Sequence, residues 1–144
     1  MATRAMISIA KREEGVSFSE IPDKTIVDIY NHWDGYPEGL GVTLASYLDG
    51  MKITNGIGSK ENPDYIFAGL GCMAASIVAH LKDGPGGIYI EDRGSHSWIE
   101  YHYYVWGDYD KGIWISIFDC DDGCIFVGKP RDLLKKYTGS WYTN

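Results

Sequence analysis

The sequence predicts an α+β fold in which an antiparallel sheet of five to six strands carries two longer helices on one face and a short C-terminal helix. Three observations predict it: two strand-like stretches near the start, a middle region with helical periodicity, and a second half of strand-like runs joined by hairpin residues. Such segregation of helices and strands is typical of α+β proteins. The 144 residues show no repeat and no linker, so we expect a single domain spanning 1–144.

The first half is predicted to hold two strands and two helices. Residues 4–10 and 25–31 are rich in apolar and β-branched side chains, as strands are. From Pro37, which suits a first helical turn, apolar residues recur at helical spacing. A second helix is predicted over 69–82, and the sequence DGPGG that follows it should end it.

The second half is predicted to contain four strands, 87–92, 97–106, 112–119 and 124–128, and a helix over 130–137. In the second of these strands, alternate residues on both faces are apolar or aromatic. One face should meet the helices. We expect a second copy of the chain to cover the other, which predicts a homo-oligomer; the alternative is a surface that tolerates tyrosine.

The charge balance excludes one class of function. The chain has 13 basic and 20 acidic residues, a net charge of -7. Direct binding to nucleic acid is not expected, because it needs a cationic surface that displaces counterions from phosphates. An acidic chain can instead occupy a cationic groove on a partner protein, although solubility alone explains the same charge.

The three cysteines and the apolar runs point to a cytoplasmic protein with no membrane contact. The odd cysteine count does not suit a disulfide framework, and no stretch resembles a signal peptide or a membrane span. Cys120 and Cys124 flank the acidic turn DCDDGC, which lacks the paired CxxC spacing of zinc sites. We therefore expect a hairpin turn there, no metal and no cofactor, and the sequence leaves open whether these two cysteines bind a metal.

The segment YNHWDGYPEGLG, residues 30–41, is the first candidate site. It joins a predicted strand to a predicted helix, but Pro37 and the acidic side chains disfavour a phosphate loop. His32 and Asp34 are candidates for a base and the group that orients it. The favoured interpretation is structural, with Trp33 and Tyr36 plugging the core while His32 and Asp34 hydrogen-bond the turn.

The segment YIEDRGSHSW is the second candidate site, with Asp92, Arg93 and His96 as its candidate binding residues. Arg93 is suited to clasp a phosphate or a carboxylate through two N–H donors, or to pair with Asp34. We expect this turn to face the 32–34 junction.

These motifs together resemble an uncharacterised family of small tailed-phage proteins. The shared features are the opening MATR, a Tyr-x-His-Trp-Asp-Gly-Tyr segment and a later Asp-Arg-Gly segment, in the same order. The chain departs from the family at Glu91, where an arginine is common. The resemblance implies a phage or prophage accessory protein that acts inside a bacterial cell, and it transfers no catalytic residue.

Three functions follow as hypotheses. The first is a non-enzymatic accessory protein that binds and neutralises a host defence factor. The second is a protein that sequesters a small or cyclic nucleotide, held by Trp33, Tyr36 and Arg93. The third is a hydrolase that uses His32, Asp34 and Asp92.

Overall fold

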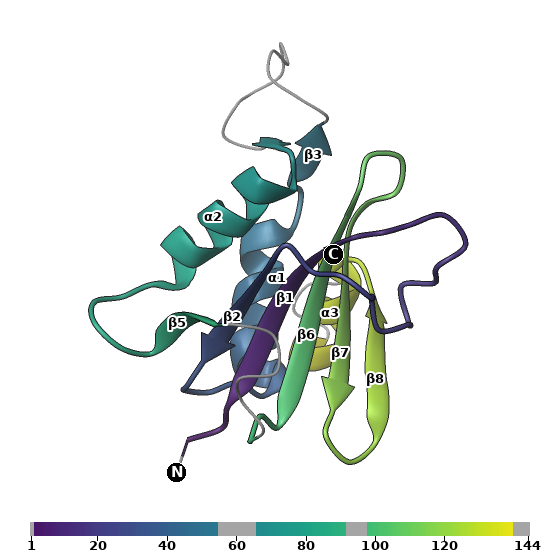
Figure 1. Cartoon of the computed structure of the whole chain (residues 1–144). Helices are drawn as coiled ribbons and strands as arrows, with labels where there is room; N and C mark the ends of the chain where they lie inside the picture. Colours follow the sequence, from purple (N-terminus) through teal and green to yellow (C-terminus); the bar gives the residue numbers. More distant parts are fainter. Residues whose placement is uncertain (1, 55–65, 92–97, 140–144) are drawn as a thin grey trace.

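The computed structural model describes residues 2–54, 66–91 and 98–139, and these form an α+β fold built on a six-stranded sheet (Figure 1). The sheet order is β5-β2-β1-β6-β7-β8. Its strands are β1 (Ala5–Lys11), β2 (Val27–Asn31), β5 (Ile88–Glu91), β6 (Tyr101–Asp108), β7 (Gly112–Asp119) and β8 (Gly123–Gly128). The helices are α1 (Val42–Leu48), α2 (Leu70–Leu81) and α3 (Pro130–Thr138), with a π-helical turn, η1 (Pro37–Gly41), before α1.

The sheet is mixed, so the prediction of an antiparallel sheet is wrong in one respect. At its centre β1 pairs in parallel with β6, with Ala5 opposite Tyr101, while the other four pairs are antiparallel. The chain leaves the sheet at the edge strand β5 and re-enters it at β6, with β2 and β1 lying between the two. Because β5 and β6 both run in the direction of β1, the returning strand meets β1 in parallel.

The helices also differ from the prediction of two longer ones and a short last one. α2 has 12 residues, α3 has 9 and α1 only 7. The predicted start at Pro37 is confirmed, but the first turn is wider than an α-helix, with the Val42 N–H bonded to the Pro37 carbonyl. A parallel pair of three-residue strands, β3 (Lys52–Thr54) and β4 (Ile66–Ala68), was not predicted, since such short strands show no periodicity.

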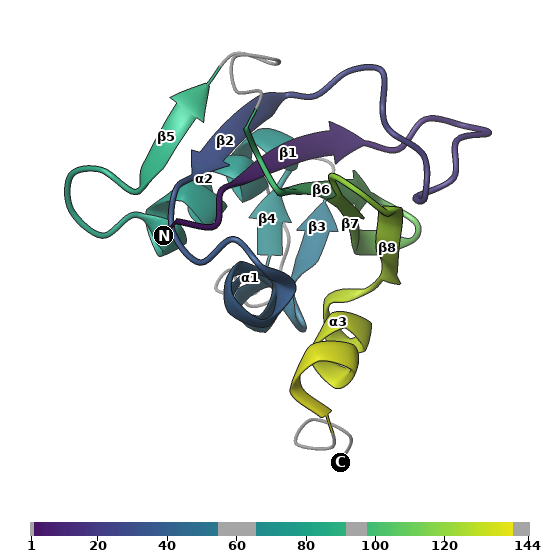
Figure 2. The same cartoon turned by 90° about the horizontal axis from the view of Figure 1, so that it is seen from below.

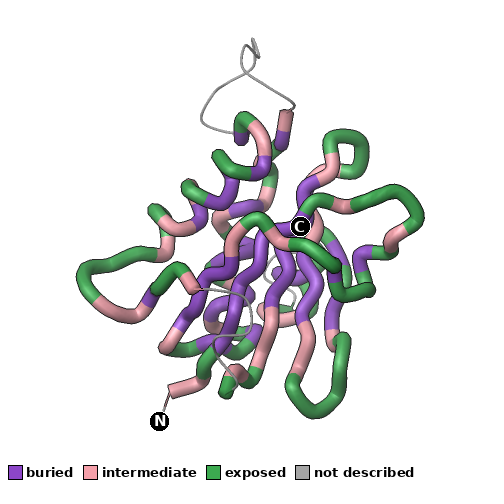
Figure 3. Tube along the Cα trace, in the orientation of Figure 1, coloured by how far each residue is buried: buried purple, intermediate pink, exposed green. Residues whose placement is uncertain are grey.

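The main core lies between the helices and one face of the sheet (Figure 2). Alternate residues of the central strands point toward the helices; they include Ile7 and Ile9 of β1 and Tyr103 and Val105 of β6, all fully buried. Figure 3 shows that burial is concentrated in these strands and that the hairpin turns are exposed.

The opposite face of the sheet is covered by the segment 12–26, which crosses it in Figure 2. Phe18 stacks on Trp114, with ring centroids 4.6 Å apart, and meets Trp106 edge-on at 5.6 Å. Trp106 is 0% exposed and Tyr104 only 4%. Tyr104 and Trp106, of the aromatic face from which the sequence predicted a homo-oligomer, are therefore covered within one chain, whereas Trp98 is 76% exposed. That prediction loses part of its basis and stays untested.

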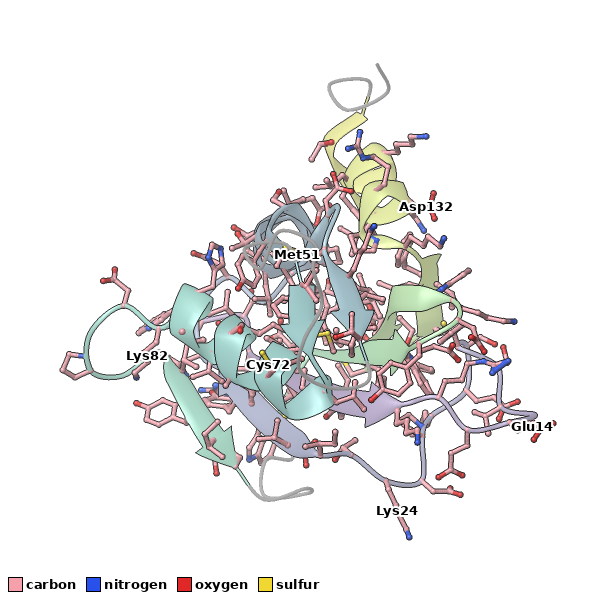
Figure 4. All side chains as sticks on the ribbon, turned by 90° about the horizontal axis from the view of Figure 1, so that it is seen from above. Glu14, Lys24, Met51, Cys72, Lys82 and Asp132 are labelled. Atoms are coloured by element: carbon pink, nitrogen blue, oxygen red, sulfur yellow. The ribbon has the colours of Figure 1, made fainter. Side chains whose placement is uncertain are left out.

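On each edge strand of the sheet, one backbone carbonyl accepts a hydrogen bond from a lysine. On β5, the Lys82 ammonium donates to the Ile88 carbonyl at 2.9 Å and to the Gly86 carbonyl at the same distance; Figure 4 shows Lys82 at the end of α2, beside the turn into β5. On β8, the Lys136 ammonium donates to the Ile125 carbonyl at 2.8 Å, next to a bulge in the β7–β8 pairing. Lysines and bulges are recognised means of preventing edge-to-edge association.

No helix among the described residues is long and apolar enough to cross a membrane.

This arrangement predicts that the lysines keep the sheet from growing. The double variant Lys82→Met and Lys136→Met exposes the Ile88 and Ile125 carbonyls and should form species of higher mass than the wild type in light scattering after gel filtration. The control variant Lys111→Met and Lys135→Met removes the same charge and should keep the wild-type mass. Equal masses for all three proteins at matched concentration would contradict the role of these lysines.

Candidate functional site

The backbone of the junction between β2 and η1 is compressed against its neighbours. Asp34 has a φ of 54°, a left-handed conformation that aspartate tolerates better than most residues. Its backbone carbonyl accepts from the Leu40 N–H at 2.9 Å. Gly35 and Gly39 lie too close to other backbone atoms for a side chain: a Cβ at Gly35 would be 2.8 Å from the Thr3 carbonyl oxygen. At Gly39 it would be 2.6 Å from the Asp34 carbonyl oxygen.

A buried tyrosine ties this junction to the centre of the sheet. The Tyr103 hydroxyl, on β6, donates to the Gly35 carbonyl at 2.7 Å, and the side chain is fully buried. Burial raises the pKa of Tyr103 far above its ordinary value, so the hydroxyl keeps its proton and remains a donor. The junction is therefore a rigid part of the fold.

The aromatic side chains of the junction are exposed, contrary to the interpretation that they plug the core. Trp33 is 59% exposed and Tyr36 39%. His32 instead hydrogen-bonds through Nδ1 to the Tyr30 hydroxyl at 2.7 Å, which agrees with a structural role. The Asp34 carboxylate accepts a long hydrogen bond, 3.5 Å, from the Tyr36 hydroxyl.

Both the backbone and the indole of Trp33 have neighbours that position them. The Asn31 side-chain amide donates to the Trp33 backbone carbonyl at 2.6 Å, and the His32 ring meets the indole edge-on, with centroids 4.4 Å apart. Gly87 also lies beside the indole: a Cβ there would be 3.5 Å from Cδ1. The His32 N–H also donates to the Gly87 carbonyl at 2.8 Å, which fixes this turn against the junction.

A groove of about 280 Å³ runs beside Trp33. It is also lined by residues of the turn 83–87 after α2 and by Leu81 and Ile88. Tryptophan is enriched among the residues that dominate binding interfaces. This combination makes the Trp33 junction the main candidate site.

A second polar cluster lies on the sheet face opposite the helices. The Ser8 hydroxyl, on β1, donates to the Asp28 carboxylate at 2.6 Å and lies 2.7 Å from Nε2 of His102. Since the single hydroxyl proton goes to Asp28, Nε2 of His102 is the donor to Ser8. Thr25 adds a further bond to the same Asp28 oxygen at 3.0 Å, and the Tyr104 hydroxyl lies 3.3 Å from Nδ1 of His102.

The chemistry of this Ser8 cluster is structural. A nucleophilic serine needs a histidine that accepts its proton, with the acid on the far side of the histidine. Here the serine stands between the acid and the histidine, and Ser8 is 0% exposed. The cluster was not predicted, because its signal in the sequence is a polar residue inside each of three largely apolar strands, Ser8, Asp28 and His102. Which strands pair cannot be deduced from that.

The residues predicted to form the catalytic set do not assemble among those that are described. No hydrogen bond joins the side chains of His32 and Asp34. The His32 ring bonds to the Tyr30 hydroxyl, and the Asp34 carboxylate accepts from the Tyr36 hydroxyl. Asp92, Arg93 and His96 lie outside the described residues. Glu91, which precedes them, lies opposite Asp28 in the pairing of β5 with β2. This is the end of β2 that is farther from His32.

The acidic turn between β7 and β8 is a hairpin turn, as predicted. Asp119, Cys120 and Asp121 bring their ligand atoms within 4.8 Å of one another at the surface, and the Asp121 N–H donates to the Asp119 carboxylate at 2.8 Å. Loss of hydration and then the carboxylates of Asp121 and Asp119 raise the pKa of the Cys120 thiol. The thiol of the free side chain is therefore protonated at neutral pH.

Comparisons with known proteins find no protein that is significantly similar to this chain. No protein-family model matches it, and neither a curated protein nor a solved structure is significantly similar to it.

The packing of the junction predicts that its glycines are not equivalent. Gly35→Ala and Gly39→Ala should each lower the free energy of unfolding by about 1–3 kcal/mol, because the added methyl group meets backbone atoms. Gly41→Ala is the matched control: its Cβ would lie 3.4 Å from the nearest atom, in the Tyr103 ring, and a helical alanine should leave stability unchanged or higher. Urea unfolding measures all three, and a Gly35→Ala variant as stable as wild type would contradict the close approach.

The Ser8 cluster predicts a specific cost for removing one hydroxyl. Ser8→Ala leaves the buried Asp28 carboxylate and the His102 ring without their shared partner and should destabilise the protein by about 1–3 kcal/mol. Ser17→Ala, at an exposed serine in the covering segment, should change stability by less than about 0.5 kcal/mol. Thermal unfolding distinguishes the two, and equal stability of both variants would show that the cluster does not stabilise the fold.

Proposed function

We propose that this protein is a non-enzymatic accessory protein that binds a host protein through the Trp33 junction and so blocks it. The observation that carries the proposal is the combination of 59% exposure with immobilisation at Trp33. Tryptophan gives a large contact area at little cost in conformational entropy, and an immobilised side chain has less entropy to lose on binding.

Two further observations favour binding over catalysis. Two histidines that could act as bases already have side-chain hydrogen-bond partners. His32 bonds to the Tyr30 hydroxyl, and His102 bonds to the Ser8 hydroxyl. The net charge of -7 suits a partner whose surface is basic, such as a host protein that itself handles nucleic acid. The resemblance to small tailed-phage proteins agrees with a host factor as the target.

A small nucleotide is the alternative ligand, because a base can stack on the Trp33 indole beside a groove of about 280 Å³. It ranks second since Asp83 lines the groove and Asp34 lies in the adjoining junction, and both would repel a phosphate.

The test is to locate the contact. A photo-crosslinking residue placed at position 33 should capture one host protein repeatedly, while the same residue at Tyr109, an exposed aromatic of the β6–β7 turn, should not. Trp33→Ala should weaken the complex at least about 30-fold, as expected for a dominant interface residue, and Tyr109→Ala less than about twofold. Thermal unfolding of both variants serves as the control for folding.

Two outcomes would contradict the proposal. One is a partner that binds the Trp33→Ala variant as tightly as wild type. The other is stabilisation of the wild type, but not of the Trp33→Ala variant, in a thermal-shift panel of cyclic and linear nucleotides, which would favour the nucleotide alternative.

A further inference from the structure

The groove beside Trp33 is lined by residues of three kinds. Trp33 is aromatic, Asp83 is acidic, and Leu81, Pro85 and Ile88 are apolar. A ligand that fits must therefore combine an apolar stem with a group that is attracted both to an aromatic face and to a carboxylate.

The charge of Asp83 is uncompensated within the part of the chain that is described. No cation lies within salt-bridge distance of its carboxylate there. The adjacent Lys82 does not neutralise it, because the Lys82 ammonium is bonded to the Gly86 and Ile88 carbonyls and lies 5.6 Å from the centre of the Tyr89 ring. Asp83 is thus exposed and free to pair with a cation from outside.

The polar groups around the groove disfavour an anion. The Asn31 amide that lines it donates to the Trp33 carbonyl, and the Gly87 carbonyl accepts from the His32 N–H. A phosphate entering here would meet the Asp83 carboxylate, and no basic residue among those described lines the groove itself, although Lys82 lies behind the Gly86 and Ile88 carbonyls.

An arginine side chain satisfies all three features of the groove. Its guanidinium stacks on a tryptophan face, pairs with a carboxylate through two N–H donors, and is weakly hydrated enough to leave water at modest cost. Its methylene stem suits the apolar residues. A lysine ammonium is more strongly hydrated and makes no planar stack.

We propose that the groove between Trp33 and the turn 83–87 receives an arginine side chain of the partner protein, stacked on the indole and paired with Asp83. This inference rests on the proposed function, since it names the chemistry by which the partner is recognised. It agrees with the net charge of -7, because arginine-bearing surfaces are the ones that an acidic protein attracts.

The test uses the full chain and a blocked tetrapeptide, Gly-Arg-Gly-Gly, observed through the indole N–H resonance of Trp33, which the Trp33→Phe variant identifies. The arginine peptide should shift this resonance with a dissociation constant of about 1–10 mM, the range expected for a single side chain. The same peptide with citrulline, a neutral isostere of arginine, should bind at least about fivefold more weakly.

The role of Asp83 is tested with a matched pair of variants. Asp83→Asn should weaken the arginine peptide about three- to fivefold, as expected for an exposed ion pair, and the effect should shrink at high salt. Asp110→Asn, at an exposed aspartate of the β6–β7 turn, should change nothing.

Several results would overturn the inference. These are no shift of the Trp33 resonance up to about 50 mM peptide, equal binding of the citrulline peptide, an Asp83→Asn variant that binds as well as wild type, or a lysine peptide that binds as tightly as arginine. If the peptide fails while a captured host protein still requires Trp33, the arginine inference fails alone. If the peptide binds as described but no host protein requires Trp33, the proposed function fails alone.

Discussion

The fold depends on the parallel pairing of β1 with β6 at the centre of the sheet. Without it the molecule would be two separate strand groups, β5-β2-β1 and β6-β7-β8, each with an unsatisfied edge. The pair also supplies the most deeply buried side chains of both faces: Ile7 and Val105 toward the helices, Ala10 and Trp106 toward the covering segment. A sheet buried on both faces at its middle is the usual setting for parallel pairing.

Two polar contacts fix the register of this central pair from opposite sides of the sheet. On one side the Ser8 cluster joins β1, β2 and β6, so that a slip of one residue would bury an unpaired carboxylate. On the other side the Tyr103 hydroxyl reaches the Gly35 carbonyl. The position of Trp33 thus follows from the sheet centre: the strand register places Gly35, and Gly35 places the residue two positions before it.

Sequence patterns predicted the elements better than their arrangement. The strand 112–119 is predicted to the residue and α2 nearly so, because period-2 and helical spacings are local properties. The parallel pairing of β1 with β6 was not predicted, because hairpin residues indicate pairing only between strands that are consecutive in the chain. Trp33 was predicted to lie in the core, yet it is 59% exposed; its exposure depends on which distant segments pack beside the junction, and a local pattern does not show that. The Ser8 cluster joins residues up to 94 positions apart, a separation over which no pattern in a single sequence carries information.

The place of the Trp33 junction in the chain has a consequence for how this protein can change. Trp33 lies just after β2, and its exposed side chain takes no part in the pairing of β2 with β1 or β5. The two edge strands each have one carbonyl bonded to a lysine, far along the chain from this side chain. Substitutions of the exposed junction side chains can therefore change what this surface contacts without disturbing strand pairing. The sheet and the junction surface are in this sense independently variable.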